Sequence, residues 1–208
     1  MKRILFIILM IMPFMGMEAQ KEIKLNAPGK MRGTAVMKAL ADRYSEREFA
    51  ARELSLQDLS DLLWAANGVN RPDGKRTAPS ALNKQDIDIY VVMAKGAYLY
   101  NHTAHSLELI AAGDHRAAVA GAQDFVKEAA ACLVMVSDLS RFGAVDEHTL
   151  LMGTIDAGLV SQNINIFCSA VGLNTVPRVS MDQEILKKIL KLSASQRLIL
   201  NNPVGYRK

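Results

Sequence analysis

The spacing of apolar residues predicts three amphipathic helices. Apolar positions recur every three or four residues, as on one buried helix face, over 34–41, 55–67 and 182–192. Ser55 precedes the second stretch as a candidate N-cap, and Gly68 follows it as a stop signal. We therefore expect the second helix to be the best defined of the three.

Residues 149–171 form a longer stretch with apolar side chains on most sides. Such a helix is expected to be central, or buried in a subunit interface. Asp156 and Asn163 are seven residues apart and share one face of it. We expect them to make a polar contact across a dimer.

Strands are predicted where apolar and polar residues alternate. Ile87, Ile89 and Val91 follow this pattern and predict a strand over 87–93, paired through a turn at Lys95-Gly96 with a second strand at 97–100. We also expect helical segments at 105–112 and 114–130, a buried strand at 131–137 and a last short strand at 198–200. This mixture of elements predicts an α+β fold.

The first nineteen residues differ from everything that follows. Lys2 and Arg3 precede an apolar run from Ile4 to Phe14, which is the pattern of a secretory signal. The run is shorter than the about 20 apolar residues that span a bilayer. We expect residues 1–19 to direct export, to the periplasm, and to be the only contact with a membrane. An uncleaved membrane anchor and a cytoplasmic protein are the alternatives.

The remaining chain is expected to form one unit. Residues 20–33 have no clear period and predict an N-terminal arm, which leaves 34–208 as a single domain. The net charge of +4 is mild and the basic residues are scattered, so we expect no nucleic-acid partner. Cys132 and Cys168 lie in apolar stretches and are expected to be buried thiols, while a disulfide between them stays open.

The segment Arg43-Tyr44-Ser45-Glu46-Arg47 is a candidate anion site. In an extended chain, alternate side chains share one side, so Arg43, Ser45 and Arg47 would converge. Arginine presents a planar fork of donors to phosphate oxygens, and a serine hydroxyl adds another donor. A basic pair on a solvated helix end is the alternative.

Three motifs in this order resemble the flavin-dependent nitroreductase superfamily. They are the Arg43–Arg47 segment after a short helix, Pro79-Ser80 with Asn83 and Gln85 before a strand, and Gly172-Leu173-Asn174-Thr175 after a long helix. The resemblance covers most of residues 34–206. Its nearest subgroup includes azoline-oxidising dehydrogenases of peptide-modifying systems, which Leu54-Ser55-Leu56, Leu62–Gly68 and Arg76–Ser80 resemble.

The resemblance implies a fold and a cofactor. The fold is a mixed, mainly antiparallel sheet flanked by helices, in an intertwined homodimer that holds FMN at its interface. Arg43 and Ser45 match the family positions that bind the FMN phosphate. Arg47 matches a basic residue near N1 and O2 of the flavin ring, where a positive group stabilises the negative charge of reduced flavin.

A second loop matches the polar edge of the flavin. Asn83 matches the amide that pairs with this edge, as both donor and acceptor. Ser80 and Gln85 are secondary candidates from the same loop. A plain turn built by Pro79, Ser80 and Asn83 is the alternative.

The chain departs from the family pattern in two places. Family members often place a Glu-Gly pair after a proline near flavin N5, where this chain has Pro177-Arg178-Val179-Ser180. The backbone N–H of Ser180 would then replace the glycine donor, and Arg178 would lie at the surface or bring charge to the substrate side. Many relatives also bind the phosphate with a basic residue beyond a Gly-Tyr-Pro-like turn. Here Arg207 is the candidate for that contact, and a frayed terminus is the alternative.

The activity implied is an FMN-dependent oxidoreductase that exchanges hydride at flavin N5 with a quinone, a nitroaromatic or another conjugated small molecule. No protein acid or base is assigned, because the cofactor carries the difficult chemistry. NAD(P)H is the candidate electron donor, although an exported enzyme would need another reductant. The alternatives are a flavin-binding envelope protein without turnover, an envelope protein that has lost flavin, and an azoline- or peptide-type dehydrogenase.

Overall fold

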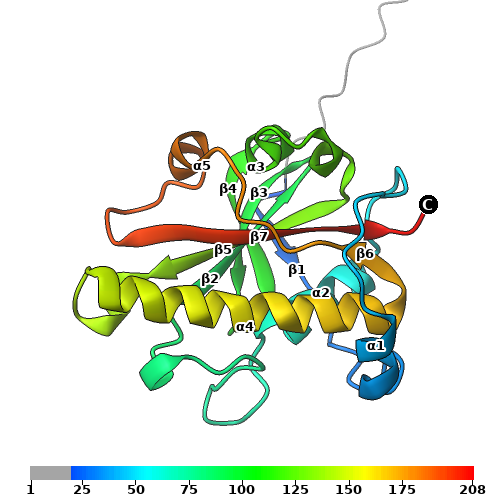
Figure 1. Cartoon of the computed structure of the whole chain (residues 1–208), viewed down its shortest axis with the longest axis horizontal. Helices are drawn as coiled ribbons and strands as arrows, with labels where there is room; N and C mark the ends of the chain where they lie inside the picture. The colour runs from blue at the N-terminus through cyan, green and yellow to red at the C-terminus, as the bar shows by residue number, and fades with distance from the viewer. Residues whose placement is uncertain (1–19) are drawn as a thin grey trace, which may run out of the picture.

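The computed structural model describes residues 20–208, and the expected signal segment 1–19 lies outside the described residues. The fold is α+β and is built on a seven-stranded antiparallel sheet in the order β1-β4-β3-β2-β5-β7-β6 (Figure 1). The strands are β1 (Glu22–Lys24), β2 (Ile87–Met93), β3 (Gly96–Asn101), β4 (Ser106–Ala112), β5 (Ala131–Asp138), β6 (Leu173–Thr175) and β7 (Gln196–Tyr206).

Five α-helices and three short 3-10 helices complete the described chain. They are α1 (Val36–Asp42), α2 (Leu56–Asn67), α3 (Arg116–Ala120), α4 (Glu147–Val171) and α5 (Gln183–Ile189), with η1 (Ala81–Asn83), η2 (Asp124–Glu128) and η3 (Leu139–Phe142). Among residues 20–208, no helix is both long and apolar enough to cross a membrane.

Both faces of the central strands are covered. In β2, Ile89 and Val91 belong to a core shared with α2 and α4, whereas Tyr90 and Val92 belong to a second core with α3 and α5. Successive strand residues point to opposite faces, so one strand serves two cores. Cys132 and Cys168 are free, fully buried thiols, as the apolar context predicts.

Helix α4 is the longest element and has well-defined ends. The Asp146 side chain accepts a hydrogen bond from the Thr149 N–H, and the Thr149 hydroxyl in turn accepts from the Asp146 N–H, which forms a capping box. Gly172 ends the helix at φ +79°, a conformation that suits glycine. One face of α4 packs on the sheet, while Leu151, Ile155 and Leu159 are exposed on the other.

The predicted helix at 105–112 is wrong, because this stretch forms β4. Its leucine, glutamate and alanine residues are good helix formers, but its backbone pairs with β3, with Leu107 opposite Tyr100. The hairpin turns at His105, which takes φ +48°. Ladder hydrogen bonds to β3 therefore override the local preference.

The predicted helix at 114–130 is also wrong in extent. The chain forms only α3 and η2 there, separated by Gly121 at φ +55°. A residue in that conformation interrupts the helical hydrogen-bond ladder. The last strand, β7, is longer than the predicted 198–200, and the short strands β1 and β6 were not predicted at all.

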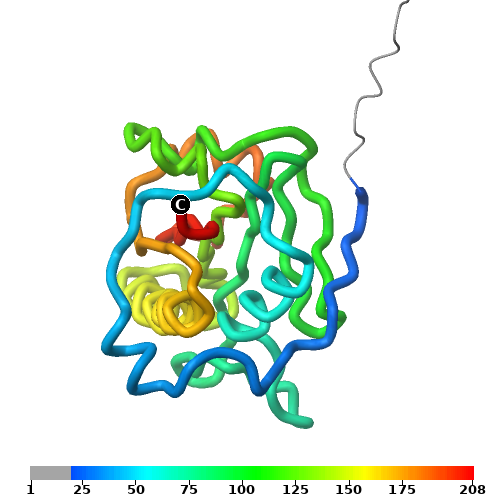
Figure 2. The backbone as a smooth tube through the Cα atoms, turned by 90° about the vertical axis from the view of Figure 1, so that its right-hand side faces the viewer, coloured from blue at the N-terminus to red at the C-terminus, as the bar shows by residue number. Residues whose placement is uncertain are grey.

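Residues 20–33 pack against the domain. The Asn26 N–H donates to Ser60 Oγ (2.9 Å), and the Gly29 N–H donates to Asp61 Oδ1 (2.7 Å). The Arg32 guanidinium forms ion pairs with Asp58 and Asp61. Figure 2 shows this stretch along one edge of the molecule and then beneath α2, before the chain turns up toward residues 43–50.

We predict that Gly153→Ala destabilises the fold by about 1–3 kcal/mol, because a methyl group there overpacks the α4–β5 contact. A Cβ at position 153 would lie 2.2 Å from Ser137 Oγ and 2.8 Å from Ser137 Cβ. Chemical unfolding monitored by circular dichroism measures the loss. Gly158→Ala in the same helix is the control, since a Cβ there meets no described atom within 4 Å, and it should change stability by less than about 1 kcal/mol. Equal stability of the two variants would contradict the packing argument.

Candidate functional site

The segment that follows α1 is extended and is anchored by its backbone. The Glu46 N–H donates to the Thr175 carbonyl (3.0 Å), and the Ala50 N–H donates to the Tyr206 carbonyl (2.9 Å). Asn174 Nδ2 donates to the Glu48 carbonyl (2.8 Å). Residues 43–50 therefore run beside β6 and the end of β7.

The extended geometry separates the side chains of this segment, as the alternation predicts. Tyr44 and Glu46 line a hollow of about 10 Å³. Arg43, Ser45 and Arg47 do not line it and are exposed. Within residues 20–208, neither guanidinium of Arg43 and Arg47 makes an ion pair. Two cations beside an exposed hydroxyl are suited to an anionic group.

Arg207 lies on the Tyr44 side of the segment. It is exposed and lines the same small hollow, together with Asp42, Tyr44 and Glu46. The hollow has room for about one water molecule, which is too little for a phosphate. Phosphate binding by Arg207 therefore stays a prediction.

The chain after β6 leads to Ser180, and Arg178 anchors this stretch to the neighbouring elements. Arg178 is 7% exposed, and its guanidinium donates to the carbonyls of Val119 and Ala120. It also donates to the side-chain oxygens of Gln123 and Asn201. The expectation that Arg178 lies at the surface or faces a substrate is wrong, because Arg178 is buried and its guanidinium donates to acceptors of the same chain.

Asn201 completes this arrangement. Its side-chain amide donates to the carbonyls of Arg178 and Ser180, both at 3.2 Å, and its backbone exchanges two hydrogen bonds with Arg178. Ser180 is exposed, and no described residue accepts its backbone N–H. The sequence analysis missed Asn201. The signal was an Asn201-Asn202 pair inside an otherwise apolar strand.

Residues 80–85 form a tight loop with unusual backbone angles. Leu82, Asn83 and Gln85 have φ values of +52°, +53° and +49°, which non-glycine residues rarely adopt. The Gln85 N–H donates to Ser80 Oγ (2.8 Å), and the side chain of Asn83 is exposed. The structure around the loop must therefore hold it in this shape.

Asp156 of α4 anchors this loop. Its carboxylate accepts the Ala81 N–H at 2.8 and 3.0 Å, and Asp156 is only 2% exposed. Asn163 Nδ2 donates to the Ala66 carbonyl. Asp156 is thus buried within the protomer, whereas the expected contact of Asn163 across a dimer stays a prediction.

Asp86 is fully buried next to this anchor. One of its carboxylate oxygens accepts the Ser137 hydroxyl, and the other has no partner among the described residues. Burial, together with the proximity of the Asp86 carboxyl group, raises the pKa of Asp156 from its ordinary value to about 6. Two adjacent buried carboxyl groups favour sharing a proton, since both cannot ionise cheaply.

The predicted site residues fall into two groups that one protomer does not bring together. Arg43, Ser45, Arg47 and Arg207 lie in or beside the segment that runs along β6, and Ser180 follows β6 and is held by Asn201 of β7. Ser80, Asn83 and Gln85 belong to the 80–85 loop, where Ser80 and Gln85 line a separate small cavity.

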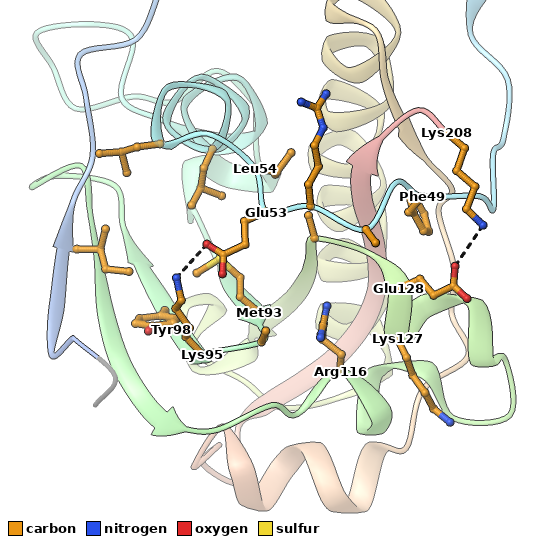
Figure 3. Close-up of a pocket in the computed structure, with 17 residues that line it drawn as sticks. Phe49, Glu53, Leu54, Met93, Lys95, Tyr98, Arg116, Lys127, Glu128 and Lys208 are labelled. Atoms are coloured by element: carbon orange, nitrogen blue, oxygen red, sulfur yellow. Dashed lines mark hydrogen bonds and ion pairs between the residues drawn. The ribbon is translucent and has the colours of Figure 1, made fainter. Parts of the chain in front are cut away.

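A much larger cavity, of about 750 Å³, lies between residues 49–54 and the turn that joins β2 to β3 (Figure 3). None of the eight predicted site residues lines it. The sequence analysis missed this cavity, because its walls come from distant parts of the chain that share no motif.

A family model described as "Nitroreductase family" matches residues 40–206. A protein of Methanocaldococcus jannaschii that bears a nitroreductase name is 30% identical over 176 residues, which are 80% of this chain and 88% of that protein. A crystal structure from Ralstonia eutropha JMP134, also named as a nitroreductase, is 34% identical with a TM-score of 0.85, and 91% of each chain is covered.

More distant structures share the fold. The NADPH:FMN oxidoreductase of Vibrio harveyi, in complex with NAD+, is 18% identical to this chain with a TM-score of 0.64. The match covers 83% of this chain and 69% of that one. At this level of identity, the similarity concerns the fold alone.

We predict that Asp156→Asn removes a pH-dependent loss of stability. The raised pKa means that the folded chain binds an extra proton between its ordinary value of 3.8 and about 6. This contribution to wild-type stability is therefore present at low pH and is lost as the pH rises through that window. The neutral amide can accept the Ala81 N–H and donate to Asp86 at every pH.

Thermal unfolding of both proteins from pH 4.5 to 7.5 measures the effect. The stability of the variant relative to wild type should rise by roughly 1–3 kcal/mol across this range. A difference that does not change with pH would contradict the shared-proton arrangement.

Proposed function

Because this chain belongs to the nitroreductase family, we propose that it is an FMN-dependent oxidoreductase that works as a homodimer. The observation that carries the proposal is the hydrogen bond from the Glu46 N–H to the Thr175 carbonyl. This bond holds the Arg43–Arg47 segment beside the strand that leads to Ser180. Candidate ligands for the two ends of one cofactor thus lie on neighbouring segments.

The residues present fit FMN. Arg43 and Ser45 are exposed and suited to hold the phosphate, and Arg47 follows on the same side of the extended segment. The Ser180 N–H has no acceptor among the described residues, and Asn201 fixes the backbone that presents it. The Ser180 N–H would thus take the place of the glycine N–H of the family pattern.

FMN, when bound, supplies hydride exchange at N5, first with an electron donor and then with an acceptor. The residues of this chain would bind the cofactor and stabilise its reduced form. Arg47 places a positive charge near the edge of the ring that becomes electron-rich on reduction, and the Ser180 N–H donates toward N5. We propose a quinone, a nitroaromatic or another conjugated molecule as acceptor, and NAD(P)H as a donor where it is available.

A second copy would complete the site. The 80–85 loop lies below α4 in Figure 1, apart from the segment that carries Arg43. We therefore assign Ser80, Asn83 and Gln85 to the flavin of the partner. Leu151, Ile155 and Leu159 of α4 are 59%, 56% and 40% exposed, and Val36 and Met37 of the adjoining α1 are more exposed still. Large apolar patches of this kind mark protein interfaces.

We place the enzyme outside the cytoplasm. The support is the basic start and apolar run of residues 1–19, which would be removed to leave the arm 20–33 and the FMN-binding domain 34–208. A periplasmic enzyme of this kind needs a reductant other than cytoplasmic NAD(P)H. The mature N-terminus, sequenced from fractionated cells, tests this placement, and Met1 on a cytosolic protein would contradict it.

We predict that Arg43→Ala combined with Ser45→Ala weakens FMN binding by roughly 2–5 kcal/mol, because two charge-assisted contacts to phosphate are lost. Fluorescence titration of the flavin-free protein with FMN measures this change. Arg197→Ala with Ser193→Ala is the matched control, since the side chains of both residues bond only within residues 193–197. Unchanged FMN affinity in the first double variant would refute the phosphate assignment.

We predict that Ile155→Glu yields a folded monomer that holds FMN less tightly. The side chain is 56% exposed, so the charge disturbs a partner and not the protomer core. Sedimentation velocity reports the assembly state, and the visible spectrum reports bound flavin. Ile185→Glu, at a 49% exposed position on α5, is the control and should stay dimeric and yellow. A dimeric Ile155→Glu variant would show that α4 does not form the interface.

A further inference from the structure

We propose that the 750 Å³ cavity is a second ligand site, separate from the proposed flavin site, and that it binds a small amphipathic organic carboxylate. This inference goes beyond the proposed function and does not require it. The cavity's lining, its charge and one preorganised arginine support this inference.

The cavity has the size and the walls of a small-molecule site. Its volume falls within the roughly 300–1,000 Å³ that is typical of ligand pockets. Its apolar lining comes from the 49–54 segment, α2 and the β2–β3 hairpin, and includes Phe49, Leu54, Leu59, Met93 and Tyr98. Phe49 and Tyr98 are each 1% exposed, so the surrounding core holds their rings in place. An aromatic ring or a short alkyl chain fits these walls.

Positive charge dominates the rest of the lining. The only acidic residues that line it are Glu53 and Glu128, and each is already paired, with Lys95 at 2.9 Å and with Lys208 at 3.5 Å. Figure 3 shows these two ion pairs at opposite ends of the cavity, with Arg116 between them. Three further cations line it: Arg52, Arg116 and Lys127. Arg116 and Lys127 pair with Asp114 and Asp124, which do not line the cavity, and Arg52 has no carboxylate partner among residues 20–208. The lining therefore carries more basic than acidic side chains, which favours a ligand with a negative group.

Arg116 is held in place with donors to spare. Its Nε and Nη2 donate to the Asp114 carboxylate, and its Nη1 donates to the Ala129 carbonyl (2.8 Å). A guanidinium has five N–H groups, so two remain for another acceptor. The side chain is 18% exposed, and its anchors restrict its rotation. A carboxylate that binds here meets an arginine that is already ordered.

The cavity is separate from the residues assigned to the flavin. Phe49, whose ring stacks on Phe125 with centroids 6.4 Å apart, belongs to its wall. Arg43, Ser45, Arg47 and Ser180 do not line it. Ligands at the two sites should bind independently.

The test compares two probes that differ only in charge, 2-naphthoate and the neutral 2-naphthalenemethanol. Isothermal titration calorimetry on the full chain should show one naphthoate per protomer, bound at least about tenfold more tightly than the alcohol, because only the carboxylate uses Arg116. Naphthoate binding should be the same with and without saturating FMN. No binding, equal binding of the two probes, or displacement of naphthoate by FMN would overturn the proposal.

Two variants locate the binding. Arg116→Met should lower naphthoate affinity to that of the alcohol. Ala51→Trp, at an exposed position that lines the cavity, should fill it and weaken both probes at least about tenfold without touching Arg116. Arg71→Met removes an exposed arginine elsewhere and should change neither affinity. Naphthoate binding that survives Ala51→Trp would place the ligand outside this cavity.

Discussion

The polar side chains on the buried face of α4 are the constraint on which the rest of this structure depends. Asp156, Ser161 and Asn165 are all less than 10% exposed, and a buried polar group without a partner costs about 1–3 kcal/mol. Asp156 finds its partner in the Ala81 N–H, and Ser161 donates to Asn202 Oδ1. Asn202 Nδ2 donates in turn to Asn165 Oδ1 and Thr175 Oγ1. One helix face thus positions both the 80–85 loop and β6, which are the two halves of the candidate flavin site.

The two halves differ in how their charges are satisfied. Below the surface, Arg178 donates to several neutral acceptors, and the Asp156 carboxylate accepts the Ala81 N–H, so these buried polar groups find partners within the chain. At the surface, Arg43 and Arg47 have no carboxylate partner among residues 20–208, and the apolar face of α4 is uncovered. The protomer thus satisfies its interior polar groups and leaves these two cations and the apolar side chains of α4 exposed.

The substitution of Arg178-Val179-Ser180 for the more common glycine-containing turn shows how one change is compensated. Glycine would let the backbone approach a flavin without side-chain interference. Here Asn201 holds the Ser180 carbonyl, and Arg178 ties the same turn to α3, so the backbone N–H of Ser180 is presented by a rigid support instead. The large cavity has Phe49 in its wall, and the arm residue Ile23 and the β2–β3 hairpin also line it.

The sequence by itself determined the α+β class, α2 with its Ser55 cap, strands β2 and β5, and the long α4. These features depend on local periodicity and capping, which neighbouring residues encode. The tertiary structure decided the rest. Residues 106–112 form a strand because they pair with β3. Arg178 points inward because α3 and Asn201 supply acceptors for its guanidinium. Asp156 accepts the N–H of Ala81, which is 75 residues away in the chain. The 750 Å³ cavity exists only where distant segments meet. These contacts join residues that are far apart in the chain, so no local sequence pattern predicts them.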